Sequence, residues 1–234
     1  METILVVAAE VRELVGLVRR CGKMENPGWP LDFVRLAELN GYRLVLAANG
    51  TGPERAAEAF DVAARNGKLD RVVSTGSCGA LDPSLEAGDV FVASRVEDAG
   101  GGGSYRTEVP GSPQAKAIGV LFSVDRVVRT AAEKRALRAC GASVVEMESA
   151  GLAARAAGAS LPFYCVRAVL DTAMEEFDTD FNRVRDSSGR LRTARIVRAA
   201  LARPFRRVPE LYRLHRRSKL VARSLGDFLA DCRF

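Results

Sequence analysis

Short apolar runs alternate with segments of helical periodicity along most of this chain, and this alternation constrains the fold more than any other feature. The apolar runs have the length of buried strands, and they predict strands at 3–9, 43–48, 71–75, 89–94, 117–122, 143–147 and 162–169. Amphipathic spacing predicts helices at 10–20, 53–66, 129–140, 149–158 and 192–202. Such alternation builds βαβ units. The sequence therefore predicts an α/β fold, a three-layer αβα sandwich around a mixed, largely parallel sheet.

The C-terminal part of the chain differs in charge from the rest. The whole sequence of 234 residues has a formal net charge of +6. From Arg190 onward it holds thirteen Lys and Arg against three Asp and Glu, a net charge of +10, which leaves −4 for residues 1–189. We therefore expect an α/β domain at 1–189 and a basic helical extension at 190–234. Within the extension, residues 205–229 mix apolar and basic side chains at helical spacing, which is typical of helices that lie on membrane surfaces.

The composition disfavours several kinds of site and location. His215 is the only histidine, so neither a Ser-His-Asp triad nor a His-based zinc site is expected. Five cysteines without CxxC spacing fit the reduced thiols of a cytoplasmic protein. No apolar run reaches the roughly 18 residues of a membrane helix, and the first run is too short for a signal peptide. The basic extension contains no recognisable nucleic-acid-binding module, so no nucleic-acid partner is expected.

Acidic residues lie at the carboxyl ends of three predicted strands. Glu146 and Glu148 mark a strand-to-helix junction, Asp171 ends an apolar run, and Glu13 lies one turn into the first predicted helix. Taken singly, Glu13 also fits a solvated first-turn residue and Asp171 an ordinary helix cap. Because parallel strands gather their carboxyl ends at one edge of a sheet, the combination of Glu13, Gly76-Ser77, Glu148 and Asp171 predicts one crevice. Such acids suit sugar hydroxyls and a basic ring nitrogen.

Glycines follow two of the predicted strands. Gly76-Ser77-Cys78-Gly79 fits either a tight turn or a backbone that faces an anion or a sugar, and the sequence alone leaves both readings open. Gly50-Thr51-Gly52 has Arg55 where a dinucleotide-binding fingerprint has its third glycine. A dinucleotide cofactor is therefore not expected.

Three segments, 75–81, 145–148 and 166–171, together resemble the signatures of the purine nucleoside phosphorylase and methylthioadenosine/S-adenosylhomocysteine nucleosidase superfamily. The resemblance covers roughly residues 3–185. Segments 122–127, 202–204 and 209–214 look like the hopanoid-associated phosphorylase branch, whose members are thought to remove adenine from adenosylhopane. The resemblance implies the nucleoside phosphorylase fold for the domain at 1–189.

The resemblance also implies a role for each motif residue. Asp171 would donate a proton to purine N7 as the base leaves, and Glu13 would activate the attacking water. Glu148 would bind the ribose 2′ and 3′ hydroxyls. The other residues implied to form the substrate site are Met147 against the sugar, Gly76 and Ser77 around the water or phosphate, Val127 near the base, and Glu146 and Arg167 in support of the neighbouring acids.

Three positions depart from the family pattern. Ser74 stands where hexameric phosphorylases carry a phosphate-binding arginine, so hydrolysis is favoured over phosphorolysis. Arg12, Arg55 or an arginine of a partner subunit are other candidate phosphate anchors. Val127 stands near the position of an aromatic residue that stacks on the base in nucleosidases. Leu170 replaces the serine that precedes the catalytic Asp in many relatives, which puts in doubt a hydrogen bond that orients this Asp.

The implied activity is hydrolysis of the N-ribosidic bond of an adenine nucleoside, with adenosylhopane as the expected substrate. The alternatives are phosphorolysis with phosphate as co-substrate, a methylthioadenosine/S-adenosylhomocysteine nucleosidase, and a non-catalytic nucleoside-binding protein. No metal or organic cofactor is implied. The expected partners are a small-molecule or lipid-linked adenine nucleoside and further copies of the chain in a homo-oligomer, with a dimer favoured. The protein is expected to be cytoplasmic and to contact the inner membrane face through residues 205–229.

Overall fold

The computed structural model describes residues 1–111, 115–184, 197 and 201–234, and its strands form one ten-stranded sheet. The strands are β1 (Thr3–Ala8), β2 (Met24–Glu25), β3 (Phe33–Leu39), β4 (Tyr42–Ala48), β5 (Arg71–Ala80), β6 (Val90–Asp98), β7 (Ser104–Arg106), β8 (Ala117–Ser123), β9 (Val144–Glu146) and β10 (Phe163–Asp171). Their order is β10-β6-β8-β9-β5-β1-β4-β3-β2, with β7 on β6. Because β5 also pairs with β10, five strands close into a ring, and the other strands extend from it as an open sheet.

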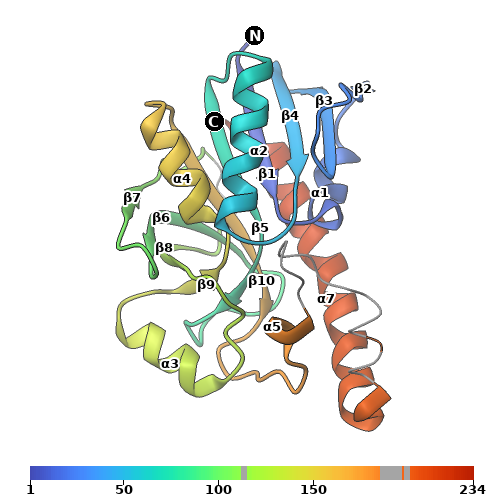
Figure 1. Cartoon of the computed structure of the whole chain (residues 1–234), viewed down its shortest axis with the longest axis vertical. Helices are drawn as coiled ribbons and strands as arrows, with labels where there is room; N and C mark the ends of the chain where they lie inside the picture. The colour runs from blue at the N-terminus through green and yellow to red at the C-terminus, as the bar shows by residue number, and fades with distance from the viewer. Residues whose placement is uncertain (112–114, 185–196, 198–200) are drawn as a thin grey trace.

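The sheet is mixed, as predicted. The pairs β1–β4, β1–β5, β5–β10, β6–β8 and β8–β9 are parallel, and the remaining pairs are antiparallel. The described helices are α1 (Val11–Val18), α2 (Pro53–Asn66), α3 (Ala131–Ala139), α4 (Ser149–Gly158), α5 (Phe181–Val184) and α7 (Pro204–Asp231). In Figure 1, α2 and α4 cover one face of the sheet, whereas α1 and α7 pack together on the other. The predicted three-layer α/β architecture is therefore confirmed.

Helices α1 and α7 cross where each has a glycine. A Cβ atom added to Gly16 would lie 1.9 Å from the carbonyl oxygen of Ala222, and one added to Gly226 would lie 2.3 Å from the carbonyl carbon of Gly16. The absence of both side chains lets the two backbones touch. Around this crossing Leu225 and Phe228 are buried in the same apolar core as β1 and β10. The second half of α7 is thus part of the body of the protein.

Some predicted features differ from the structure. The strands β2, β3 and β7 and the helix α5 were not predicted. Most of the helix predicted at 192–202 lies outside the described residues, and so does the boundary between 189 and 190, so the division into two domains stays a prediction. The 205–229 segment lies within one helix, α7, but its far end is buried rather than free to meet a membrane. In the described part of the chain, no helix combines the length and apolar character that crossing a bilayer requires.

The segment Gly76-Ser77-Cys78-Gly79 does not form a tight turn. It continues β5, pairing with Arg167 and Ala168 of β10 and, at Gly79, with Val145 of β9. The strand can continue because the small side chains fit between two neighbouring strands. The segment is therefore part of β5, one strand of the ring, and its residues Ser77, Cys78 and Gly79 line a pocket.

Candidate active site

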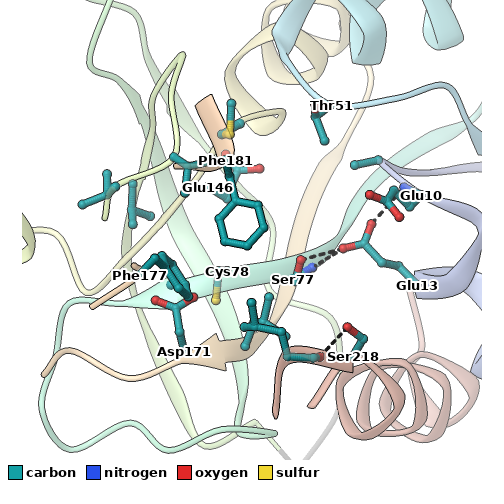
Figure 2. A pocket seen from close by; sticks show the side chains of 18 of the residues that line it. Glu10, Glu13, Thr51, Ser77, Cys78, Glu146, Asp171, Phe177, Phe181 and Ser218 are labelled. Carbon is teal, nitrogen blue, oxygen red and sulfur yellow. Dashed lines mark hydrogen bonds between the residues drawn. The ribbon is translucent and has the colours of Figure 1, made fainter. Parts of the chain in front are cut away.

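A pocket of about 290 Å³ opens where β1, β9 and β10 end and β5 passes beneath them. Figure 2 shows its acids on different sides, with Asp171 beside Phe177 and Glu13 beside Ser77. Seven of the nine predicted site residues line it: Glu13, Ser77, Val127, Glu146, Met147, Glu148 and Asp171. Gly76 and Arg167 are not in the lining but contact residues that are.

Glu13 is held by donors from two elements. Its Oε1 atom accepts hydrogen bonds from the backbone N–H of Ser77 at 2.8 Å and from the Ser77 hydroxyl at 2.7 Å. Its Oε2 atom accepts the backbone N–H of Glu10 at 3.1 Å, within the capping box that begins α1. The helix start and the middle of β5 therefore fix this carboxyl group at the rim of the pocket.

Gly76 makes room for two charged side chains. Its φ of +141° is unfavourable for a residue with a side chain, and a Cβ atom would lie 2.7 Å from Nη1 of Arg167 and 3.1 Å from both carboxyl oxygens of Glu13. Gly76 does not line the cavity, but its lack of a side chain leaves the space that Arg167 and Glu13 occupy.

Arg167 and Glu146 form a buried ion pair under the pocket floor. Their atoms Nη2 and Oε2 lie 2.5 Å apart, and both side chains are almost fully buried. Arg167 also donates to the hydroxyls of Ser74 at 2.6 Å and Ser149 at 2.8 Å, and to the carbonyl of Thr75 at 2.9 Å. Glu146 accepts the backbone N–H groups at the start of α4 as well. The pair therefore locks the strand-to-helix junction that carries Glu148.

Ser74, at the position of the phosphate-binding arginine of hexameric phosphorylases, belongs to this buried network and does not line the pocket. Of the other arginines considered as phosphate anchors, Arg12 lines the pocket, where it is paired with Glu10 at 2.7 Å. Arg55 is absent from the described lining.

Glu148 lines the pocket, and its carboxyl group holds its proton more tightly than an ordinary glutamate does. One of its oxygens accepts the backbone N–H of Gly52 at 3.0 Å. Burial, and next the charge of Glu146, raise the pKa of Glu148 to about 8, while Arg167 opposes the rise. A buried carboxyl of this kind can bind hydroxyl groups either as an acceptor or, when protonated, as a donor.

Asp171 has a buried partner that sequence reasoning missed. Nζ of Lys134 lies 2.5 Å from Oδ2 of Asp171, and the two side chains are 1% and 8% exposed. Burial raises the pKa of Asp171, and the ammonium group of Lys134 counteracts this rise. A capping box between Thr130 and Glu133 fixes the first turn of α3 and so orients Lys134. Next to Glu133 in a polar helix, Lys134 gives no sign in the sequence that it points inward.

Two phenylalanines supply the aromatic surface that Val127 lacks. Phe177 and Phe181 both line the pocket, with their rings edge to face and centroids 5.6 Å apart. Figure 2 shows the Phe181 ring within the cavity. Asn182 holds this segment in place, since its side chain accepts the backbone N–H of Val127 at 2.8 Å and donates to the Val127 carbonyl at 3.0 Å. The spacing of two phenylalanines shortly after Asp171 is the signal that could have revealed them.

Helix α7 closes another side of the pocket. One face of the helix contributes four lining residues at helical spacing, Leu211, Leu214, His215 and Ser218. The part of the chain predicted to be a separate extension thus forms a wall of the site. Within the described ranges, no group of three or more His, Cys, Asp or Glu side chains is placed to hold a metal ion.

The arrangement can support acid–base chemistry on a bond held between the acids. Asp171 has a raised proton affinity, as a proton donor to a leaving group requires. Glu13, bound to a hydroxyl and a backbone N–H on the other side, can take a proton from a nucleophile. Glu148 lines the same pocket, where it can bind the part of the substrate that carries the bond.

Comparison with known proteins gives one consistent family. The family model described as the phosphorylase superfamily matches residues 4–117 and 113–202. A 5′-methylthioadenosine/S-adenosylhomocysteine nucleosidase of Staphylococcus aureus (strain MRSA252) is 28% identical over 170 residues, which cover 61% of this chain and 75% of that protein.

Solved structures agree in fold. The nucleosidase of Neisseria meningitidis in complex with methylthio-immucillin-A has a TM-score of 0.68 at 24% identity, covering 97% of this chain and 100% of that one. The Colwellia psychrerythraea 34H nucleosidase in complex with adenine has a TM-score of 0.65 at 21% identity, covering 97% and 96%. The superfamily prediction is confirmed, while the hopanoid-associated branch stays a prediction. The family model spans well over half of the sequence, and the chain therefore belongs to the phosphorylase superfamily.

Proposed function

We propose that this protein is an enzyme that hydrolyses the N-ribosidic bond of an adenine nucleoside and releases adenine. One observation carries the proposal: Glu13, Glu148 and Asp171, predicted from three separate parts of the sequence, line a single pocket. The 28% identical relative is named for cleaving adenine nucleosides, which supports the same chemistry. A protein that only binds nucleosides has no need of a buried proton donor beside the base, so retention of Asp171 favours an enzyme.

Each acid has a distinct task in the proposed reaction. Asp171 transfers its proton to N7 of the purine while the bond to the ribose breaks, so that the base leaves in neutral form. Glu148 binds the ribose 2′ and 3′ hydroxyls, and Met147 packs on the sugar. The positive charge that develops on the ribose is stabilised by the nearby carboxyl groups. Glu13 takes a proton from the water that attacks the sugar carbon.

The hydrogen bonds of Ser77 favour water over phosphate as the nucleophile. Ser77 offers a backbone N–H and a hydroxyl, the donors that would suit a phosphate oxygen, and both already contact Glu13. A phosphate ion placed there would have to displace a carboxyl group and lie beside it, which is electrostatically unfavourable. Neither a cofactor nor a phosphate co-substrate is part of the proposed reaction.

The test is adenine release from a soluble 5′-alkyl adenosine, with and without phosphate, beside Asp171→Asn. We expect release without phosphate in the wild type and a loss of roughly 100-fold or more in the variant, whose folding is checked by thermal melting. Release that requires phosphate would identify a phosphorylase and overturn hydrolysis. No release in either buffer would leave a nucleoside-binding protein as the better description.

We further propose that the substrate carries a large apolar 5′ group, as adenosylhopane does. Leu211 and Leu214 of α7, together with Leu170, give the pocket an apolar wall. The second candidate is a methylthioadenosine/S-adenosylhomocysteine nucleosidase, favoured by the names of the relatives. If the apolar wall binds the substituent, kcat/KM rises with the length of the 5′-alkyl chain. If methylthioadenosine is turned over best, the second candidate is correct.

Peripheral membrane contact belongs to the same proposal and is now limited to the first half of α7. Phe205 is 95% exposed and Tyr212 64% exposed, with Arg206 and Arg213 also at the surface. Exposed aromatic and basic side chains are typical of helices at an anionic bilayer. Phe205→Ser with Tyr212→Ser should lower binding to anionic vesicles, whereas Ile118→Ser, 56% exposed on β8, should not. Equal vesicle binding by the wild type, the Phe205→Ser/Tyr212→Ser variant and Ile118→Ser would contradict membrane contact.

The proposed enzyme acts as a cytoplasmic homodimer that reaches the inner membrane face. Light scattering after size exclusion decides the oligomeric state, because it measures the mass of the particle directly. A mass equal to one chain would contradict the dimer.

A further inference from the structure

Lys134 makes three contacts of hydrogen-bond length although its side chain is only 1% exposed. Its Nζ atom donates to Oδ2 of Asp171 at 2.5 Å, to the carbonyl of Thr172 at 2.6 Å and to the carbonyl of Glu175 at 2.9 Å. An ammonium group has three protons, so each contact can take one of them. This geometry is that of a charged lysine, because a neutral amine has only two protons for three acceptors.

We propose that Lys134 is a positioning residue for Asp171, and this inference rests on the proposed function. The ammonium group holds Oδ2, which turns the other oxygen, Oδ1, toward the substrate. It also stabilises the carboxylate that Asp171 becomes after it gives its proton to the leaving base. In that step the O–H bond of Asp171 breaks, an N–H bond forms on the base, and the electron pair of the ribosidic bond passes to the base. Lys134 keeps all its protons throughout.

The charged groups around Asp171 explain why a cation is needed. Besides Lys134 from α3, Asp171 is influenced by Glu175 after β10 and by Arg217 from α7, and the thiol of Cys78 on β5 lies on the same pocket wall. Glu175 forms an ion pair with Arg217, and the two charges act on the pKa of Asp171 in opposite directions. Burial alone would make Asp171 a weak acid that keeps its proton, and the nearest group that opposes this effect is Lys134.

A purely structural role is the competing explanation. Lys134 could simply tie α3 to the turn at 172–175 through the carbonyls of Thr172 and Glu175. Loss of such a tie would lower stability and activity together, at every pH. Loss of an electrostatic effect on Asp171 would instead move the pH at which activity declines. The pH dependence therefore separates the two explanations.

The experiment compares Lys134→Met and Lys134→Arg with the wild type, and with Lys68→Met, whose lysine side chain is 86% exposed, as the matched control. Asp171 must be protonated to act, so kcat falls as the pH rises through its pKa. Removing the ammonium group raises that pKa, so Lys134→Met should move the alkaline decline to higher pH. Its maximal kcat should fall by roughly tenfold or more, because the acid is weaker. Lys134→Arg keeps the charge and should keep the decline near its wild-type position.

A double-substitution cycle and a direct titration complete the test. In an Asp171→Asn background, Lys134→Met should lower kcat little further, because Lys134 acts through Asp171. Carbon NMR of the Asp171 carboxyl measures its titration without any reaction. If the wild type releases no adenine, the proposed function fails, but the titration still decides the effect of Lys134. The same Asp171 titration in the wild type and in Lys134→Met would overturn the inference.

Discussion

Ser77 donates both its backbone N–H and its hydroxyl to the same oxygen of Glu13, at 2.8 and 2.7 Å. The two donors orient the carboxyl group at the pocket. A glutamine at this position could keep both bonds through its amide oxygen, so the chemistry of Glu13 can be changed while its link to Ser77 stays.

Glu13→Gln should abolish most of the hydrolysis while keeping the two bonds to Ser77. The amide oxygen can still accept both donors of Ser77, but the amide cannot take a proton from water, and its NH2 group loses the capping bond that Oε2 accepts from the backbone N–H of Glu10. We expect kcat to fall by about 100-fold or more, with little change in the Kd of a non-hydrolysable adenine nucleoside measured by calorimetry. A variant with wild-type kcat would show that Glu13 is not the base.

The stability of the protein should depend on the protonation of Glu148. Its pKa is about 8 in the folded protein, above the 4.5 of an ordinary glutamate, so folding takes up a proton between these two values. The resulting stabilisation is complete below about pH 4.5 and is lost as the pH rises through 8. Glu148→Gln removes this dependence. Melting curves at pH 6 and pH 9 should therefore show a smaller loss of Tm in the variant than in the wild type.

Gly76→Ala should damage both the site and the fold. The new methyl group would lie 2.7 Å from Arg167 and 3.1 Å from Glu13, on a backbone whose φ of +141° disfavours a side chain. We expect a loss of about 1–3 kcal/mol in the free energy of unfolding and a kcat reduced beyond what that loss explains. Gly158→Ala, whose Cβ would meet nothing within 4 Å, is the control. Equal behaviour of the two variants in denaturation and activity assays would contradict this account.

Gly226→Ala should separate α7 from α1. The added Cβ would lie 2.3 Å from the backbone of Gly16, so the helices must move apart. We expect a loss of stability of at least about 1–3 kcal/mol in urea denaturation, together with a higher KM, because the first half of the same helix lines the pocket. Gly22→Ala, with open space around it, should change neither quantity.

The sequence was sufficient to predict those helices and strands that have strong periodicity or clear caps. Helix α2 begins at Pro53 as predicted, because proline suits the first helical turn, and α4 begins at Ser149 directly after the two acids. Strand β3 was missed because its apolar residues are interrupted by Arg35 and Glu38 and only Val34 and Ala37 of its seven residues are buried. The two-residue β2 and three-residue β7 are too short to leave a pattern.

The site was predictable where its residues occur in sequence motifs, and less so where it depends on packing. Glu13, Glu148 and Asp171 follow from the strand ends, and they meet in one pocket. Lys134 could not be found in the same way, because only the folded chain shows that a helical lysine points inward. The course of β5 through Gly76 likewise depends on its neighbours β9 and β10.

The position of α7 has a consequence for how the protein matures during synthesis. Every strand of the sheet precedes this helix in the chain, yet Leu211, Leu214 and Ser218 form a wall of the pocket. While the ribosome is still adding residues up to Asp231, a nascent chain can assemble its sheet but leaves the cavity open on that side. The cavity can close only when translation has passed Asp231 and α7 has docked, so a chain stalled before that point would carry all three acids and still lack a complete site.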